Sequence, residues 1–218
     1  MERMEMKKIK ILGEGSSSGG EFEKVQVIGQ GEIGGDVKAK ITKITGECHI
    51  KGNALIDQYN LTGKGIIDGE LECEEVKVIG DLTVTDSLKA TIFNMRGFVT
   101  SNGNAEMEKM TIKGGFHIEG LMNVGELSVN LQVANSKVQE IGGENITIKS
   151  KSLFNKTYTL EAEIIEGDNI YLEYTTANVV RGNDVEIGPG CEIKFVEYRS
   201  TFKCSDKNTK KIAEVKQI

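Results

Sequence analysis

The sequence contains one proline, no tryptophan and two histidines among its 218 residues, and it has no apolar run of about 18 residues. It therefore predicts no integral membrane segment. Its start, MERMEMKKIKIL, lacks the apolar stretch of a signal peptide, so we expect a cytoplasmic protein. The scarcity of proline, which removes a backbone donor, favours a chain whose amide groups are committed to β-ladders.

Basic residues are also in the minority, with 27 Lys and Arg against 33 Asp and Glu and a net charge of −6. This balance lacks the basic footprint of nucleic-acid binding, so we expect no nucleic-acid partner. The 38% of hydrophobic residues alternate with the charged ones, which excludes a disordered chain. The 26 glycines indicate many sharp corners. Collagen, which combines glycine with abundant proline, is excluded.

Glycine recurs at every seventeenth position over a long part of the chain. One column contains Gly29, Gly46, Gly63, Gly80, Gly97 and Gly114, and a second contains Gly35, Gly52, Gly69, Asp86, Gly103 and Gly120. Counted from the first column as position 0, apolar residues occupy positions −9 and −7, −4 and −2, and +2 and +4. A spacing of two places side chains on one face of a short strand. Three such strands per period predict an all-β, triangular, parallel β-solenoid whose coils stack about 4.8 Å apart.

The period fails after Leu131, although the related phrases IGGENITI, IEGDNIYL and VRGNDVEI follow. We expect an N-terminal segment or cap over residues 1–18, a regular β-helix over 19–150, and an irregular β-rich module over 151–218, built either as uneven turns of the same solenoid or as a cap. The Gly- and Ser-rich residues 13–20 suggest a flexible lead-in, and residues 149–159 suggest the boundary. The final SDKNTKKIAEVKQI fits either a short helix from Ser205 or a last strand with a polar tail.

Two short motifs resemble catalytic or cofactor signatures. Residues 29–34, GQGEIG, match the dinucleotide fingerprint, but that motif must open a helix, whereas the residues that follow alternate like a strand. Residues 15–19, GSSSG, match the nucleophile elbow but lack the strand before it and the helix after it. We interpret the first as part of the glycine repeat and the second as a flexible loop, and we expect no catalytic residue and no cofactor.

The histidines and cysteines give no metal or redox pattern. His49 and His117 share position +3 four coils apart, about 19 Å at 4.8 Å per coil, which is too far to share a metal ion. Cys48 and Cys73 fall at inward positions and are interpreted as small buried apolar residues. Cys191 and Cys204 form no C-x-x-C motif. In the expected cytosolic setting we predict no disulfide.

The phrases EFEKVQVIGQGEIGGDVKA, DGELECEEVKVIGDLTV and EMEKMTIKGGFHIEGLMNV resemble the bactofilins, polymer-forming cytoskeletal proteins of bacteria. The resemblance covers about residues 19–133, and VRGNDVEIGPGCEIKFVEY resembles continuations in some cytoplasmic members. It implies a right-handed β-helix that assembles end to end without a nucleotide. Typical bactofilins carry proline-rich tails, whereas this chain adds residues 134–218, a module that would cap one end.

We therefore expect a non-enzymatic structural protein that associates with itself, as a dimer or filament, or with another scaffold or cell-envelope protein. The ends of a solenoid are open strand edges, and we predict the assembly end at Phe22, Val25, Val27 and Ile33. Two alternatives remain at this level. One is a hexapeptide-like acyltransferase on a triangular solenoid, and the other is a monomeric protein-interaction module.

Overall fold

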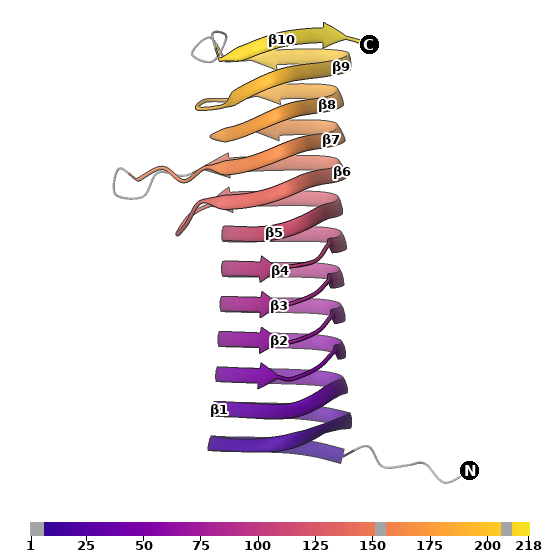
Figure 1. Ribbon diagram of the computed structural model, residues 1–218, viewed down its shortest axis with the longest axis vertical. Coiled ribbons are helices and arrows are strands. Elements are labelled where there is room, and N and C mark those ends of the chain that lie inside the picture. The colour runs from indigo at the N-terminus through magenta and orange to yellow at the C-terminus, as the bar shows by residue number, and fades with distance from the viewer. Residues whose placement is uncertain (1–6, 151–155, 206–210) are drawn as a thin grey trace, which may run out of the picture.

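The computed structural model describes residues 7–150, 156–205 and 211–218, which form a single stack of β-coils (Figure 1). Within these ranges there is no helix, and ten parallel strands make one sheet in the order of the chain. The strands are β1 (Lys7–Ile50), β2 (Ala54–Ile67), β3 (Leu71–Val84), β4 (Leu88–Ser101), β5 (Ala105–Leu131), β6 (Ser136–Ser150), β7 (Leu160–Leu172), β8 (Thr175–Ile187), β9 (Glu192–Cys204) and β10 (Ile212–Gln217).

The coils from β1 to β5 repeat with the period that the glycine columns predict. Gly46 pairs with Gly63, Gly63 with Gly80, and Gly80 with Gly97. β2 to β4 and β6 to β9 each cover most of a coil, whereas β1, with 44 residues, and β5, with 27, each run through more than one coil, because the backbone stays extended around the corners. β10, with 6 residues, covers only part of a coil. The sheet therefore winds continuously around one apolar core, and the parallel β-solenoid is confirmed.

The predicted inward positions are buried. In the β2 coil they are Ala54 and Ile56, Tyr59 and Leu61, and Gly65 and Ile67. The residues between them are exposed or half-buried. Each inward side chain lies above its counterpart in the preceding coil, so the core is a set of continuous columns that no single coil can form alone.

The first glycine column is fixed by a close backbone approach. Gly63 has φ +126°, and a Cβ atom there would lie 2.0 Å from the carbonyl oxygen of Gly46. The same relation recurs up the column, with Gly80 above Gly63 and Gly97 above Gly80. Only glycine satisfies both the backbone angle and the contact between coils.

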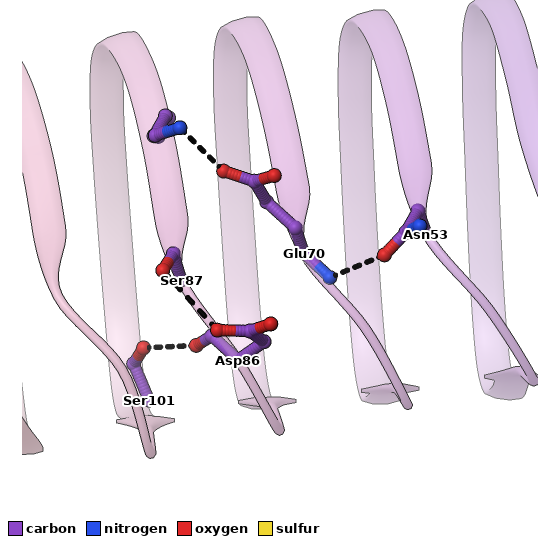
Figure 2. Close-up of polar contacts among 6 residues, drawn as sticks. Asn53, Glu70, Asp86, Ser87 and Ser101 are labelled. Atoms are coloured by element: carbon purple, nitrogen blue, oxygen red, sulfur yellow. Dashed lines mark hydrogen bonds and ion pairs between the residues drawn. The ribbon is translucent and has the colours of Figure 1, made fainter.

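The second glycine column lies beside a ladder of side-chain acceptors at another corner. The Oδ1 atom of Asn53 accepts a hydrogen bond of 2.9 Å from the backbone N–H of Glu70 in the next coil (Figure 2). Asp36 accepts the N–H of Asn53 in the same way, at 2.7 Å. A Cβ atom at Gly69 would lie 2.3 Å from the Asn53 oxygen. Glycine is needed here because the ladder occupies the space.

Asp86 replaces glycine at one corner of the second column. The hydroxyl of the buried Ser101 donates a 2.7 Å hydrogen bond to the Asp86 carbonyl oxygen, and the Ser87 hydroxyl lies 3.2 Å from an Asp86 carboxylate oxygen (Figure 2). A polar side chain at an inward position is thus satisfied by the corner backbone, and the stack continues without a break.

The N-terminal residues of the described chain form a further coil. Strand β1 begins at Lys7, and a Cβ atom at Gly29 would lie 2.1 Å from the Gly13 carbonyl oxygen, so Gly13 starts the first glycine column in a slightly shorter coil. An ion pair of 3.2 Å joins Lys8 to Glu23 across the two coils. The expectation of a flexible Gly- and Ser-rich lead-in is therefore wrong: small side chains allow the backbone to stack closely, and residues 13–20 are strand.

The C-terminal residues continue the same sheet in uneven coils. The paired positions are His117 with Lys137, Ser136 with Leu160, Leu160 with Thr175, and Thr176 with Glu192, so the offset changes from one coil to the next. β6 and β7 pair directly in spite of the longer connection between them, and both continue the stack (Figure 1). Of the two predicted arrangements, uneven turns of one solenoid is the one observed.

The last element is a strand rather than a helix. β10 pairs in parallel with β9, placing Ile212 beside Ile193 and Val215 beside Val196. The predicted helix start at Ser205 is followed by residues 206–210, which lie outside the described residues, and residues 212–217 are extended.

Candidate functional site

The residues predicted as an assembly end are core residues. Val25, Val27 and Ile33 are fully buried and Phe22 nearly so. The coil that begins at Lys7 covers them, so they belong to the second coil of the described chain. This prediction is corrected: the terminal inward positions are one coil earlier, because the sheet starts before the first full period of the glycine columns.

The first described coil presents a small cross-section. Its inward positions are Ile9, Ile11, Gly15 and Ser17. Ile9 packs half-buried against the core and Ile11 is buried. This end therefore exposes little apolar area of its own.

The opposite end is larger and more apolar. We define the C-terminal end surface as Tyr198, Phe202, Ile212, Val215 and Ile218. The Tyr198 and Phe202 rings stack with centroids 5.6 Å apart, and Ile212 packs half-buried against the core. The N–H of Ile218 donates a 2.9 Å hydrogen bond to the Tyr198 carbonyl oxygen, which holds the last strand on the stack.

Exposure along one core column shows that this surface is an open core. Met122, Ile141, Ile165, Val180 and Val196 follow each other in register, and each is at most 1% exposed. Val215 continues the same column above Val196 and is 42% exposed. Val215 therefore occupies a core position, but no further coil among the described residues stacks on it.

Sequence reasoning missed this surface, although one signal was available. Ile193 and Val196 are three residues apart and lie on either side of a corner of the core, and Ile212 and Val215 repeat this spacing. The same three-residue spacing also fits a helix, and this ambiguity left the secondary structure of the tail open.

The histidines and cysteines lie where the repeat places them. His49 and His117 occupy one outward column four coils apart, and His49 Nε2 lies 2.8 Å from Asp68 Oδ2. Cys48 and Cys73 are buried. Burial raises the pKa of the Cys48 thiol to about 11 and that of Cys73 to about 12. These thiols stay protonated near neutral pH, so neither is an activated nucleophile.

The two catalytic-looking motifs are strand. Residues 15–19 and 29–34 both lie within β1, and neither opens a helix. The glycines serve the stack instead, as the contact of Gly29 with Gly13 shows. The structural interpretation of residues 29–34 is confirmed, whereas residues 15–19, expected as a flexible loop, are strand.

Among the described residues no three His, Cys, Asp or Glu side chains gather closely enough to hold a metal ion. Within the same ranges no helix reaches the length and apolarity that a membrane crossing demands.

The outer faces of the stack differ in charge. We define the acidic face as outward positions −8 and −6 of the second to seventh coils: Glu21, Glu23, Lys38, Lys40, Leu55, Asp57, Glu72, Glu74, Lys89, Thr91, Glu106 and Glu108. We define the basic face as positions −3 and −1 from the first coil to the end of β5: Lys10, Leu12, Gln26, Ile28, Lys43, Thr45, Asn60, Thr62, Lys77, Ile79, Asn94, Arg96, Thr111, Lys113, Ser128 and Asn130. The basic face contains no carboxylate, although the whole chain is acidic.

Each face carries a shallow groove. The groove on the basic face, about 680 Å³, is lined by Lys43, Lys77, Arg96 and Lys113 together with Thr, Asn and aliphatic residues. It includes no histidine, thiol or carboxylate that could act as a general base. The groove on the acidic face, about 840 Å³, is lined by Glu72, Glu106 and Glu108 with intervening lysines.

The fold defines the class of this protein as a parallel β-solenoid with regular coils over β1 to β5. Over 87 residues it is 49% identical to "Uncharacterized protein YhbF" of Bacillus subtilis (strain 168), a match that covers 39% of this chain and 37% of that protein. Over 93 residues it is 37% identical to "Uncharacterized protein YhbE" of the same organism, covering 40% and 39%. The matches span less than two fifths of either relative. No family model and no solved structure matches the chain.

Proposed function

We propose that this protein is a non-enzymatic structural subunit that assembles end to end through its β-solenoid, as the resemblance to bactofilins implies, in the bacterial cytoplasm. The observation that carries the proposal is the open core column at the C-terminal end surface, where Val215 is 42% exposed and Val196 directly beneath it is 1% exposed. A second copy that stacks there buries an apolar cross-section, which is favourable by about 25 cal/mol per Å².

The backbone supports the same assembly. β10 is last in the strand order, so among the described residues its outer N–H and C=O groups face no further strand. Unpaired groups of this kind accept another parallel strand by continuing the ladder. Assembly through the end therefore adds hydrogen bonds and core contacts of the type that already join the ten strands.

The test compares two lysine substitutions of matched exposure. Val215→Lys places a cation on the C-terminal end surface, whereas Leu121→Lys places one on the side of the stack, outside the acidic and basic faces, where Leu121 is 37% exposed against 42% for Val215. We expect wild-type protein and Leu121→Lys to form elongated particles in negative-stain electron microscopy and concentration-dependent species in light scattering. Val215→Lys should form no elongated particles, because a copy stacked on its end would have to desolvate the ammonium group.

Circular dichroism of both variants checks that the fold is retained. The proposal fails if the wild-type chain stays strictly monomeric at high concentration in several salts. It also fails if Val215→Lys forms elongated particles as readily as Leu121→Lys does.

A further inference from the structure

The basic face runs along the side of the stack and has no part in contacts through the ends. Among the described residues no carboxylate lies within ion-pair distance of Lys10, Lys43, Arg96 or Lys113. Lys77 alone on this face is paired, with Glu75 at 2.6 Å. Four cations therefore face solvent on a surface that offers them no counter-charge.

The acidic face has the complementary surplus. Its Lys38 pairs with Glu21 at 3.6 Å, and Lys89 pairs with the corner residue Glu70 at 2.6 Å. No cation in the described ranges lies within ion-pair distance of Asp57, Glu72, Glu74, Glu106 or Glu108. Lys38 is thus neutralised by a carboxylate of the same face and Lys89 by one at the neighbouring corner, and carboxylates remain in excess on the face.

The two faces also share a spacing. Lys43 and Lys77 are two coils apart in one column, because Lys43 pairs with Asn60 and Asn60 with Lys77. The carboxylate pair Glu72 and Glu74 recurs two coils later as Glu106 and Glu108. Both repeats measure about 9.6 Å at 4.8 Å per coil, so cations of one copy can meet carboxylates of another at two successive places.

We propose that the basic face of one copy docks laterally on the acidic face of a second copy. The contact joins two different surfaces of the same chain, so each copy can take part in two such contacts and rows of stacks can form side by side. Charge complementarity between the faces drives the pairing. Lateral docking goes beyond end-to-end assembly, because it uses the sides of the coils and needs neither end of the stack.

A charge-exchange experiment on the full chain tests the pairing. Lys43→Glu with Lys77→Glu reverses the two cations of the basic face whose spacing matches the carboxylates, and Glu74→Lys with Glu108→Lys reverses part of the acidic face. In each variant alone the two faces carry like charge at these positions and should not pair. Mixed in equal amounts, each variant offers the other an oppositely charged face, so pairing should return.

The readout is carbodiimide cross-linking between lysine and carboxylate side chains, followed by mass spectrometry. A mixture of ¹⁵N-labelled and unlabelled chains separates contacts between copies from contacts within one copy. In wild type we expect links between labelled and unlabelled peptides that carry Lys43 or Lys77 on one side and Glu74 or Glu108 on the other. Their yield should fall at least fivefold between about 50 mM and about 500 mM NaCl, because salt screens exposed charges.

Electron microscopy keeps this proposal distinct from the previous one. Loss of lateral pairing alone leaves long single filaments, whereas Val215→Lys alone leaves short particles that still pair sideways. Circular dichroism of each variant excludes unfolding as the cause. The proposal is overturned if the mixed variants stay unpaired. It is also overturned if wild type gives no link between copies and instead sediments with phosphatidylglycerol vesicles, which would assign the basic face to a lipid surface.

Discussion

At the scale of single residues, the first glycine column and the buried thiols control stability for different reasons. The glycines allow neighbouring backbones to approach within contact distance, as Gly63 does above Gly46. The thiols of Cys48, Cys73 and Cys191 fill small spaces in the core and are stable there only in their neutral form.

Gly63→Ala tests the close approach. A Cβ atom at this position would lie 2.0 Å from the Gly46 carbonyl oxygen at φ +126°, so we expect the free energy of unfolding to fall by about 3 kcal/mol or more. The control is Gly34→Ala, where the nearest atom would be the Ser17 carbonyl oxygen at 3.8 Å. Urea unfolding followed by circular dichroism measures both. Equal effects of the two substitutions would contradict the steric explanation.

Alkaline pH should destabilise the fold through the buried thiols. Burial raises the pKa of Cys48 and Cys191 to about 11 and that of Cys73 to about 12, from an ordinary value of 9.0. Above about pH 9 the unfolded chain releases protons that the folded chain retains, so the free energy of unfolding falls by up to about 1.4 kcal/mol per thiol per pH unit. Below that pH these thiols leave stability unchanged.

Urea midpoints at a series of pH values from 8 to 10.5 check this prediction. The variant Cys48→Ala with Cys73→Ala should show a shallower decline, whatever its absolute stability. A profile that is flat across this range in the wild-type protein would rule out the thiol explanation. Tyr59, whose pKa burial also raises, adds to the loss at the upper end.

At the scale of the strand, the corners decide how one coil joins the next. β2 and β3 are separated by a short turn that contains Glu70. The N–H of Glu70 donates a hydrogen bond to the side chain of Asn53, which lies at the same corner one coil earlier. The carbonyl group of a side chain thus replaces a strand partner where the backbone bends. This contact explains why an amide or carboxylate side chain and a glycine share the corner.

Asn53→Ala should lower the free energy of unfolding by about 1 kcal/mol, because the Glu70 N–H loses its acceptor. Asn53→Asp keeps an acceptor oxygen, as Asp36 does one coil earlier, and should stay close to wild type. Urea unfolding of the two variants measures the difference. The ladder has no energetic role if Asn53→Ala and Asn53→Asp unfold at the same midpoint.

At the scale of the whole molecule, the stack is a chain of nearest-neighbour contacts. Contacts that are distant in sequence are therefore mostly contacts one coil apart, and no coil depends directly on a distant one. Removal of a complete coil leaves every remaining column in register, whereas removal of half a coil exchanges inward and outward positions.

Deletion of residues 64–80 removes one complete coil and joins Gly63 to Asp81, which follows the next glycine of the column. We expect this shortened protein to keep the β-sheet circular dichroism spectrum and to unfold cooperatively at a lower urea concentration. Deletion of residues 64–72 should abolish the folded state. Size-exclusion chromatography and circular dichroism distinguish the outcomes, and retention of the fold in both deletions would contradict the register argument.

The period, the inward positions and the glycine corners of β1 to β5 could all be predicted from the amino-acid sequence. These features are local, because the alternation of inward and outward residues along a strand, and the glycine that a positive φ requires at a corner, can both be seen in the sequence of a single coil. Cys48 and Cys73 could be assigned to the core for the same reason.

Tertiary packing was needed to show where the stack begins among the described residues, how the uneven coils of β6 to β10 pair, and which apolar residues form its end. Ile9 and Ile11 complete a coil only by packing on the next one, and connections of different length conceal the register of the later strands. Val215 is an exposed core position solely because nothing among the described residues lies above it. These features depend on how neighbouring strands pack, whereas the alternation of apolar and polar residues in the sequence reports only on the strand that contains it.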